Sequence, residues 1–211
     1  MENRFLTKVF RWFGLGLLIT FITAFYTSTN VTLLNLMFGT SGYLIIFILE
    51  IVLAIWLTSR IRRMESGLTK ILYIAYSILT GLTFASIFII YEISSIIFVF
   101  LATSLIFLIF SMLGKNSRID LRKVGVYLVV ALFSIIILEL INIFIMNSTL
   151  DMVLCIVGII VFIGYVYYDI NIIANYYDET DNMAIIGAFN LYLDFINIFI
   201  KLLRLFGRKR D

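Results

Sequence analysis

The sequence predicts an all-α integral membrane protein, a bundle of seven transmembrane helices with the C-terminal helix at its centre. Its 211 residues are 63% hydrophobic and 14% charged, with a mean hydropathy of +1.10, whereas soluble domains average about 25% charged residues. The apolar residues come in blocks of about twenty, the length that crosses a ~30 Å hydrocarbon core as a helix. The last block carries a stripe of polar residues that cannot face lipid and therefore requires burial.

The residues that are missing exclude several function classes. The chain has no histidine, no proline and one cysteine, Cys155. Without histidine, Ser-His and Cys-His catalysis and the usual zinc sites are excluded, and a single cysteine cannot form an intramolecular disulfide. The net charge of +3 comes from basic segments between apolar blocks, which is typical of membrane topology rather than of a nucleic-acid surface. We expect no cofactor, no nucleic-acid partner and no enzymatic activity.

The seven predicted spans together form a single transmembrane domain over residues 1–211. They cover residues 12–27, 43–58, 71–91, 94–113, 124–146, 152–173 and 183–206. Three basic residues precede the first span, which a cleaved signal peptide also has, but Phe25-Tyr26-Thr27 is no small-x-small cleavage site. A first transmembrane helix is therefore the favoured interpretation.

Ionisable residues interrupt several of these spans. Glu50 lies in the second, Glu139 in the fifth and Asp169 near the end of the sixth. Singly, such residues are explained by pairing inside the bundle or by snorkelling to the interface. Glu139 and Asn142, one turn apart, favour interhelical hydrogen bonds over chemistry.

The distribution of Lys and Arg predicts the topology. The N-terminus and the 59–70 and 114–123 connections are basic, whereas the 28–42, 91–94 and 147–151 connections contain no Lys or Arg. The N-terminus is therefore expected in the cytoplasm. Seven crossings place the acidic 174–183 loop inside and the basic tail outside. This contradicts the positive-inside rule, by which Lys and Arg gather on the cytoplasmic side. Either the last segment is re-entrant, or it crosses because it packs on the other helices; its polar stripe favours the second alternative, and the orientation of the tail stays open.

The last predicted helix carries one polar stripe. Read at helical spacing, its polar positions fall three and four residues apart and share a face. They are Asn190, Asp194, Asn197, Lys201 and Arg204. Because an ionised group at the bilayer centre costs at least a few kcal/mol, Asp194 requires a partner.

Asp169 is the candidate partner of Asp194. The two aspartates lie on the last two helices, which a short loop joins, so the helices are expected to pack antiparallel. Simple hairpin geometry leaves the aspartates offset, so that a tilt or an unwinding near Tyr176-Tyr177 is needed. Two carboxyl groups in contact in a low dielectric cannot both ionise and would share a proton. Such a pair would sense pH without histidine and, once deprotonated, would offer hard oxygen ligands to calcium.

The motifs around these aspartates resemble the Bax-inhibitor (transmembrane Bax inhibitor motif) family, and its bacterial branch in particular. The most specific string is LYLDFINIF at 191–199. The resemblance extends over much of the chain, to residues 59–61, 81–88, 115–125 and 164–169.

This resemblance implies a fold and a function. The fold is a seven-helix bundle around the last helix, and the function is a pH-sensitive calcium leak across a membrane, here expected to be the bacterial plasma membrane. The family's hydrogen-bonded dyad matches Asp169 and Asp194. Its latch, an arginine on the second helix, matches Arg60, with Arg62 as the alternative.

Three other functions compete with a calcium leak channel. An intramembrane aspartyl protease also places two aspartates on neighbouring helices, but its second motif needs glycines where this chain has Leu191-Tyr192-Leu193, and its proline-containing loop is impossible here. A proton-coupled cation transporter would use a titrating dyad equally well. A regulator that binds other membrane proteins would have to do so within the bilayer or through the basic loops. The ion selectivity, the sign of the pH response and the oligomeric state are left open.

Overall fold

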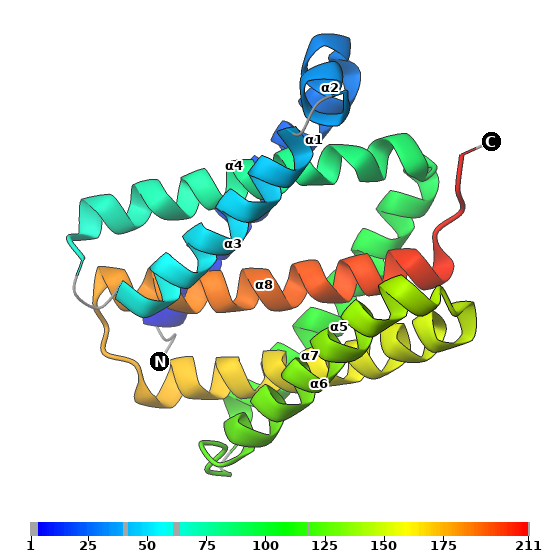
Figure 1. Ribbon diagram of the computed structural model, residues 1–211. Helices are drawn as coiled ribbons and strands as arrows, with labels where there is room; N and C mark the ends of the chain where they lie inside the picture. The colour runs from blue at the N-terminus through cyan, green and yellow to red at the C-terminus, as the bar shows by residue number, and fades with distance from the viewer. Residues whose placement is uncertain (1–3, 40–41, 61–63, 118, 211) are drawn as a thin grey trace. The chain divides into compact units, whose positions relative to one another are not determined.

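The computed structural model describes residues 4–39, 42–60, 64–117 and 119–210, and within these ranges it contains helices and no strand. Its helices are α1 (Arg4–Thr29), α2 (Val31–Phe38), α3 (Gly42–Arg60), α4 (Ser66–Ile90), α5 (Ile93–Asn116), α6 (Val124–Ile145), α7 (Ser148–Tyr176) and α8 (Asp181–Phe206) (Figure 1). All but α2 are long and apolar enough to cross a membrane. The predicted fold class, a bundle of seven transmembrane helices, is confirmed.

The helices extend beyond the predicted apolar spans. α1 begins at Arg4 rather than near residue 12, and α7 covers 148–176 rather than 152–173. Hydropathy marks only the part of a helix that lies in hydrocarbon, whereas the helix itself continues into the polar interface. The short helix α2 lies in the connection predicted for 28–42. Asn30 caps its N-terminus, because the Asn30 side chain accepts a hydrogen bond from the backbone N–H of Leu33 over 3.1 Å and so satisfies one of the free donors of the first turn.

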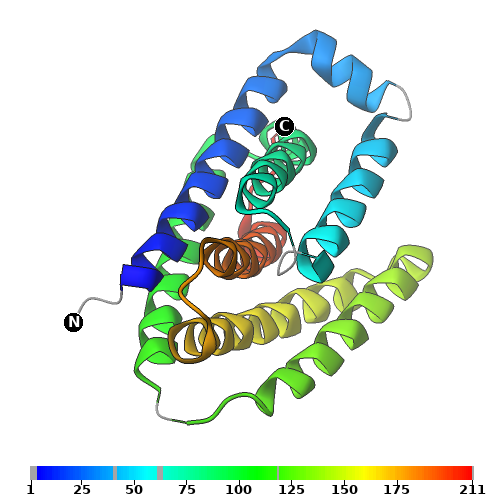
Figure 2. The same ribbon diagram turned by 90° about the vertical axis from the view of Figure 1, so that its left-hand side faces the viewer.

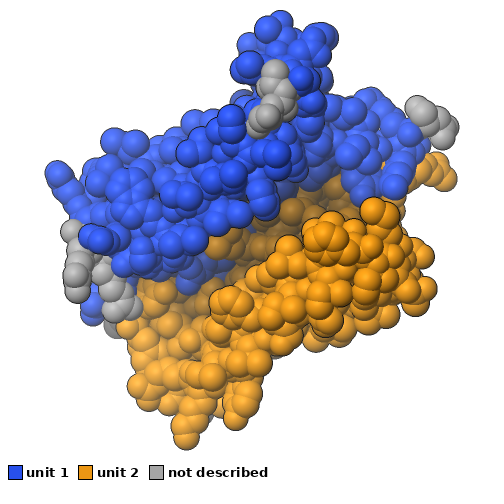
Figure 3. Space-filling view, in the orientation of Figure 1, with its two compact units in different colours: residues 1–93, 178–192, 209–211 blue, residues 94–177, 193–208 orange. Residues whose placement is uncertain are grey.

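The described chain divides into two compact units (Figure 3). Unit 1 contains residues 1–93, 178–192 and 209–211, and unit 2 contains residues 94–177 and 193–208. The N-terminal part of α8 therefore belongs to unit 1 and its C-terminal part to unit 2.

In unit 1, α4 packs against both α1 and α3, which lie on either side of it in Figure 2. Gly81 of α4 lies against the backbone and side chains of α1 at residues 20–23, so that the two helices approach closely. Tyr73 and Tyr76 of α4 pack edge-on against Phe189 and Tyr192 of α8. These ring contacts fix the first half of the last helix.

In unit 2, α6 and α7 form an antiparallel hairpin with a tight turn. α6 ends at Met146 in the left-handed conformation (φ 54°), and Asn147 caps α7 by accepting from the backbone N–H of Leu150 over 2.9 Å. Phe100 and Phe107 of α5 pack edge-on against Phe195 of α8, with ring centres 5.4 and 5.7 Å apart. The second half of α8 is thus fixed by aromatic contacts as well.

The last helix is the most buried of the seven candidate spans found in the described ranges. Of its most apolar window 72% is buried, against at most 44% for any other span. The polar stripe of the last helix predicted that this helix would be buried, and the structure agrees. Its 26 residues run without interruption, which at 1.5 Å per residue gives a length of about 39 Å. A re-entrant segment requires a break in the helix, so the full crossing is the alternative that fits.

Candidate functional site

Two helices of unit 2 bring the predicted pair of aspartates together. Asp169 of α7 and Asp194 of α8 are both buried, with 8% and 4% of their surface exposed, and their carboxyl groups hydrogen-bond to each other. α7 ends at Tyr176, and Tyr177 is extended (φ −85°, ψ 139°). Because α8 begins at Asp181, residues 177–180 form the connection between the two helices.

A hydrogen bond between two carboxyl groups requires a proton, because an ionised carboxylate can only accept. A proton shared between Asp169 and Asp194 is therefore what this contact requires, and its presence stays a prediction. The Oδ2 atom of Asp194 is buried and has no hydrogen-bond partner among the described residues. Leaving a buried polar atom unsatisfied costs about 1–3 kcal/mol, so a water molecule or a cation that reached this oxygen would be stabilised there.

Few side-chain ligands for a metal surround this pair. Nowhere in the described ranges do three or more His, Cys, Asp or Glu side chains lie close enough to hold a metal. Calcium takes six to eight oxygen ligands, so a calcium ion at Asp169 and Asp194 would need most of its ligands from water or backbone carbonyls. The assignment of these two residues as calcium ligands stays a prediction.

The predicted latch lies outside unit 2. Arg60 is exposed and is the last residue of α3 in unit 1. The alternative, Arg62, lies outside the described residues. The latch stays a prediction for both arginines.

The other stripe residues have different surroundings. Lys201, almost fully buried, donates to Oε1 of Glu139 on α6 over 2.6 Å, so Glu139 makes the interhelical hydrogen bond that its position favoured. Asn197 donates to the backbone carbonyl of Leu193 one turn earlier over 2.8 Å, and Asn190 is half-buried in unit 1. The stripe is therefore divided among several contacts rather than gathered in one site.

Sequence reasoning missed two interactions made by residues of α7 and α8. Arg204 forms an ion pair with Asp151 at the start of α7, and its Nη1 atom lies 3.9 Å from Oε1 of Glu139. Tyr165, one turn before Asp169, interacts electrostatically with both carboxyl groups of the pair. Its spacing of four residues from Asp169 was the available signal, and the high aromatic content of this helix concealed it.

The buried pair of carboxyl groups on the last two helices is the arrangement that the sequence motifs implied. Residues 2–211 match the family model described as inhibitor of apoptosis-promoting Bax1. The chain belongs to the Bax inhibitor family. Among its relatives, an uncharacterized protein of Borreliella burgdorferi is 36% identical, over 100% of this chain and 94% of its own length. The inner membrane protein YbhL of Escherichia coli is 35% identical, over 98% of this chain and 92% of its own length.

A third relative, an uncharacterized protein of Rickettsia prowazekii, is 33% identical over 99% of this chain and 91% of its own length. Similarity therefore extends over the whole bundle rather than over one motif. With seven apolar helices and relatives named as membrane proteins, this member of the Bax inhibitor family is a multi-pass protein of the bacterial plasma membrane.

Proposed function

We propose that this Bax inhibitor family protein is a pH-sensitive calcium leak channel, not an enzyme, and that protonation of the Asp169–Asp194 pair gates it. The observation that carries the proposal is the direct contact of two buried carboxyl groups on α7 and α8. An ionisable residue buried at membrane depth indicates a functional site by default.

The gating step follows from the charge of the pair. With a shared proton the two carboxyl groups hold α7 and α8 together. Without a proton two like charges in contact repel each other strongly in a low dielectric. The repulsion favours a second arrangement of the helices, and the same two charges attract a divalent cation. Loss or gain of one proton thus changes both the packing of α8 and the affinity for calcium.

Calcium flux into proteoliposomes, measured with an enclosed calcium-sensitive dye over about pH 5 to 8, tests this proposal. The flux of the unaltered protein is expected to depend on pH, and Asp169→Asn and Asp194→Asn are each expected to flatten that dependence because Asn does not titrate. Asp120→Asn, in an exposed connection of unit 2, removes a carboxylate elsewhere and should keep the original pH profile. An unchanged profile in both dyad variants would contradict the proposal.

A proton-coupled cation transporter is the second candidate, because a titrating carboxyl pair serves coupled transport equally well. A pH-sensitive dye in the same vesicles separates the two functions. Proton movement in fixed proportion to calcium favours the transporter, whereas calcium flux without it favours the channel. Absence of calcium flux at every pH would contradict both and would leave a role in binding other membrane proteins.

A further inference from the structure

A groove between α6 and α7 of unit 2 lies at the end where the basic 114–123 connection enters α6. The groove encloses a volume of about 350 Å³. Its walls are Arg122, Gly125, Val126, Val129, Val130, Tyr165 and Tyr168. It is distinct from the carboxyl pair, whose two residues do not line it.

One wall of the groove is apolar and open. Val126, Val129 and Val130 are 66%, 45% and 60% exposed, on a helix that is long and apolar enough to cross the membrane. Exposed aliphatic side chains on such a helix face lipid chains. Gly125 shapes the groove, since a side chain there would collide with the ring of Tyr168, which lies against the α6 backbone.

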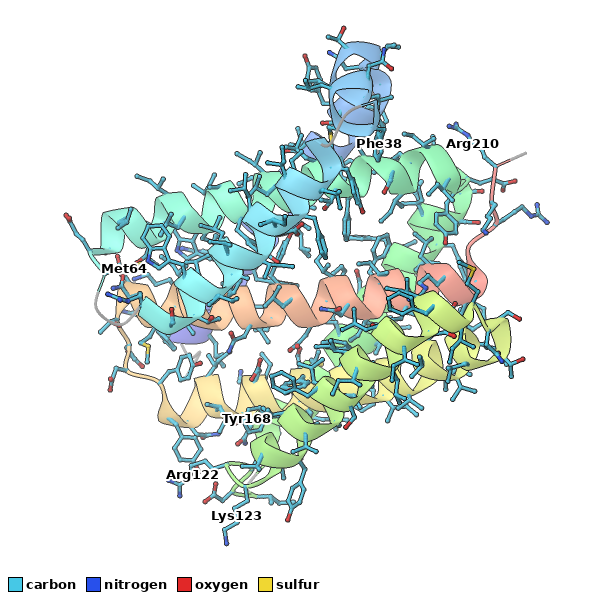
Figure 4. The ribbon with its side chains drawn as sticks, in the orientation of Figure 1. Phe38, Met64, Arg122, Lys123, Tyr168 and Arg210 are labelled. Carbon is cyan, nitrogen blue, oxygen red and sulfur yellow. The ribbon has the colours of Figure 1, made fainter. Side chains whose placement is uncertain are left out.

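The mouth of the groove is basic. Figure 4 shows Arg122 and Lys123 at the same end of α6 as Tyr168 of α7. Among residues 119–123, Arg122 and Lys123 are basic and Asp120 is acidic. Asp120 accepts hydrogen bonds from Nε and Nη2 of Arg122 over 2.8 to 3.1 Å, which leaves Nη1 for another acceptor. Lys123 is exposed beside it.

We propose that this groove binds one anionic phospholipid, with its phosphate at Arg122 and Lys123 and an acyl chain along Val126–Val130. Two observations select this ligand over others. The apolar wall would add nothing to the binding of a small soluble anion, and the excess positive charge at the mouth would add nothing to the binding of a neutral lipid. Basic pockets between transmembrane helices, on the side of the membrane where Lys and Arg gather, are suited to anionic headgroups.

Native mass spectrometry of the purified full chain tests the proposal. The protein is released from micelles that contain phosphatidylglycerol and phosphatidylcholine in equal amounts, and the retained lipids are counted. The unaltered protein is expected to retain one phosphatidylglycerol in preference to phosphatidylcholine. Arg122→Gln/Lys123→Gln should lower that preference at least about fivefold, the contribution of one basic residue near a headgroup. Arg208→Gln/Lys209→Gln removes the same charge from the exposed tail and should leave the preference unchanged.

A second pair of variants tests the apolar wall. Val130→Trp fills the groove and should abolish the retained lipid, whereas Ile160→Trp, at a 64% exposed position of α7 outside the groove, should not. Inorganic phosphate added in excess should not displace the lipid, because phosphate cannot use the apolar wall. Equal loss of preference in the two charge variants, equal retention in the two tryptophan variants or displacement by phosphate would each overturn the proposal.

Discussion

Lys201 of α8 and Glu139 of α6 form an ion pair within unit 2, with Nζ and Oε1 2.6 Å apart. The two partners are unequally buried, since 6% of the lysine side chain and 32% of the glutamate side chain are exposed. Arg204 offers Glu139 a second cation at 3.9 Å, whereas no other acidic partner of Lys201 lies within 4.0 Å among the described residues. The pair is therefore asymmetric, and Lys201 depends on Glu139 more than Glu139 depends on Lys201.

This asymmetry predicts unequal effects of removing either partner. Glu139→Leu leaves an ammonium buried without a counter-charge and should lower the free energy of unfolding by about 3 kcal/mol. Lys201→Met leaves a carboxylate that is partly exposed and still close to Arg204, so about 1 kcal/mol is expected. Equilibrium unfolding in mixed micelles with increasing sodium dodecyl sulfate measures both changes.

The double variant Glu139→Leu/Lys201→Met completes a double-mutant cycle, which measures the interaction between the two residues. Replacing both partners of a buried pair by apolar residues is often nearly neutral, so the double variant should be more stable than Glu139→Leu alone. Lys115→Met removes an exposed lysine and should change stability by no more than about 0.5 kcal/mol. Additive effects of the two single changes would show that the residues do not act as a pair.

Gly114 lets α5 approach α7 closely. We therefore expect a side chain at this position to lower the stability of the protein. A side chain at this position would collide with the backbone carbonyl of Tyr167, which cannot rotate away. Gly114→Ala should therefore destabilise the protein by about 1–3 kcal/mol. Gly14→Ala in α1, where nothing lies within 4 Å of the added carbon, should instead stabilise by about 0.5–1 kcal/mol. Thermal unfolding in detergent, monitored by circular dichroism, compares the two variants. Equal melting temperatures of the two variants would contradict the prediction.

The sequence predicted the fold and the carboxyl pair because membrane chemistry restricts the alternatives. Apolar blocks of fixed length leave little besides spanning helices, and Asp194 at membrane depth required a partner on another helix. Asp169 was found because few ionisable residues lie at that depth. The partner of Lys201 could not be selected in the same way, since both Glu139 and Glu50 were available and only packing decides between them. Glu50 instead accepts a hydrogen bond from Thr80 over 2.6 Å.

Features that depend on local geometry rather than on hydropathy were not predictable. The α6–α7 groove exists because Gly125 admits the ring of Tyr168, and a glycine in an apolar run does not indicate which side chain will lie against it. The α2 helix was not predictable either, since it lies in a segment too short to span a membrane and depends on the N-terminal cap at Asn30. The groove and α2 both arise from local contacts that the spacing of apolar residues along the sequence does not indicate.

Asp120 and Arg122 predict a pH effect outside the membrane-spanning segments. Hydrogen bonds from Arg122 lower the pKa of Asp120 from 3.8 to about 2. Because the pKa of Asp120 is lower in the folded state, its contact with Arg122 stabilises the folded state above the unfolded pKa of 3.8, and this stabilisation is lost as pH falls through about 2. Carbon NMR of the Asp120 carboxyl in micelles should give a midpoint near pH 2. Arg122→Gln should raise the midpoint toward about 3.9, and Lys123→Gln should not move it; a midpoint near 3.9 in the unaltered protein would contradict the assignment.

The hydroxyl group of Tyr192 joins α8 to α1 in unit 1, and we expect it to contribute to the free energy of unfolding. Its hydroxyl lies 2.6 Å from Oγ1 of Thr20, which donates to the backbone carbonyl of Ser77 over 2.9 Å, and the whole residue is inaccessible to solvent. Tyr192→Phe keeps the ring contacts and removes one buried hydrogen bond, so the free energy of unfolding should fall by about 1 kcal/mol. Tyr127→Phe, at a 76% exposed position of α6, makes the same chemical change without a buried partner and should leave the free energy of unfolding unchanged. Equal effects of the two substitutions would show that the hydroxyl of Tyr192 contributes nothing to the attachment of the last helix.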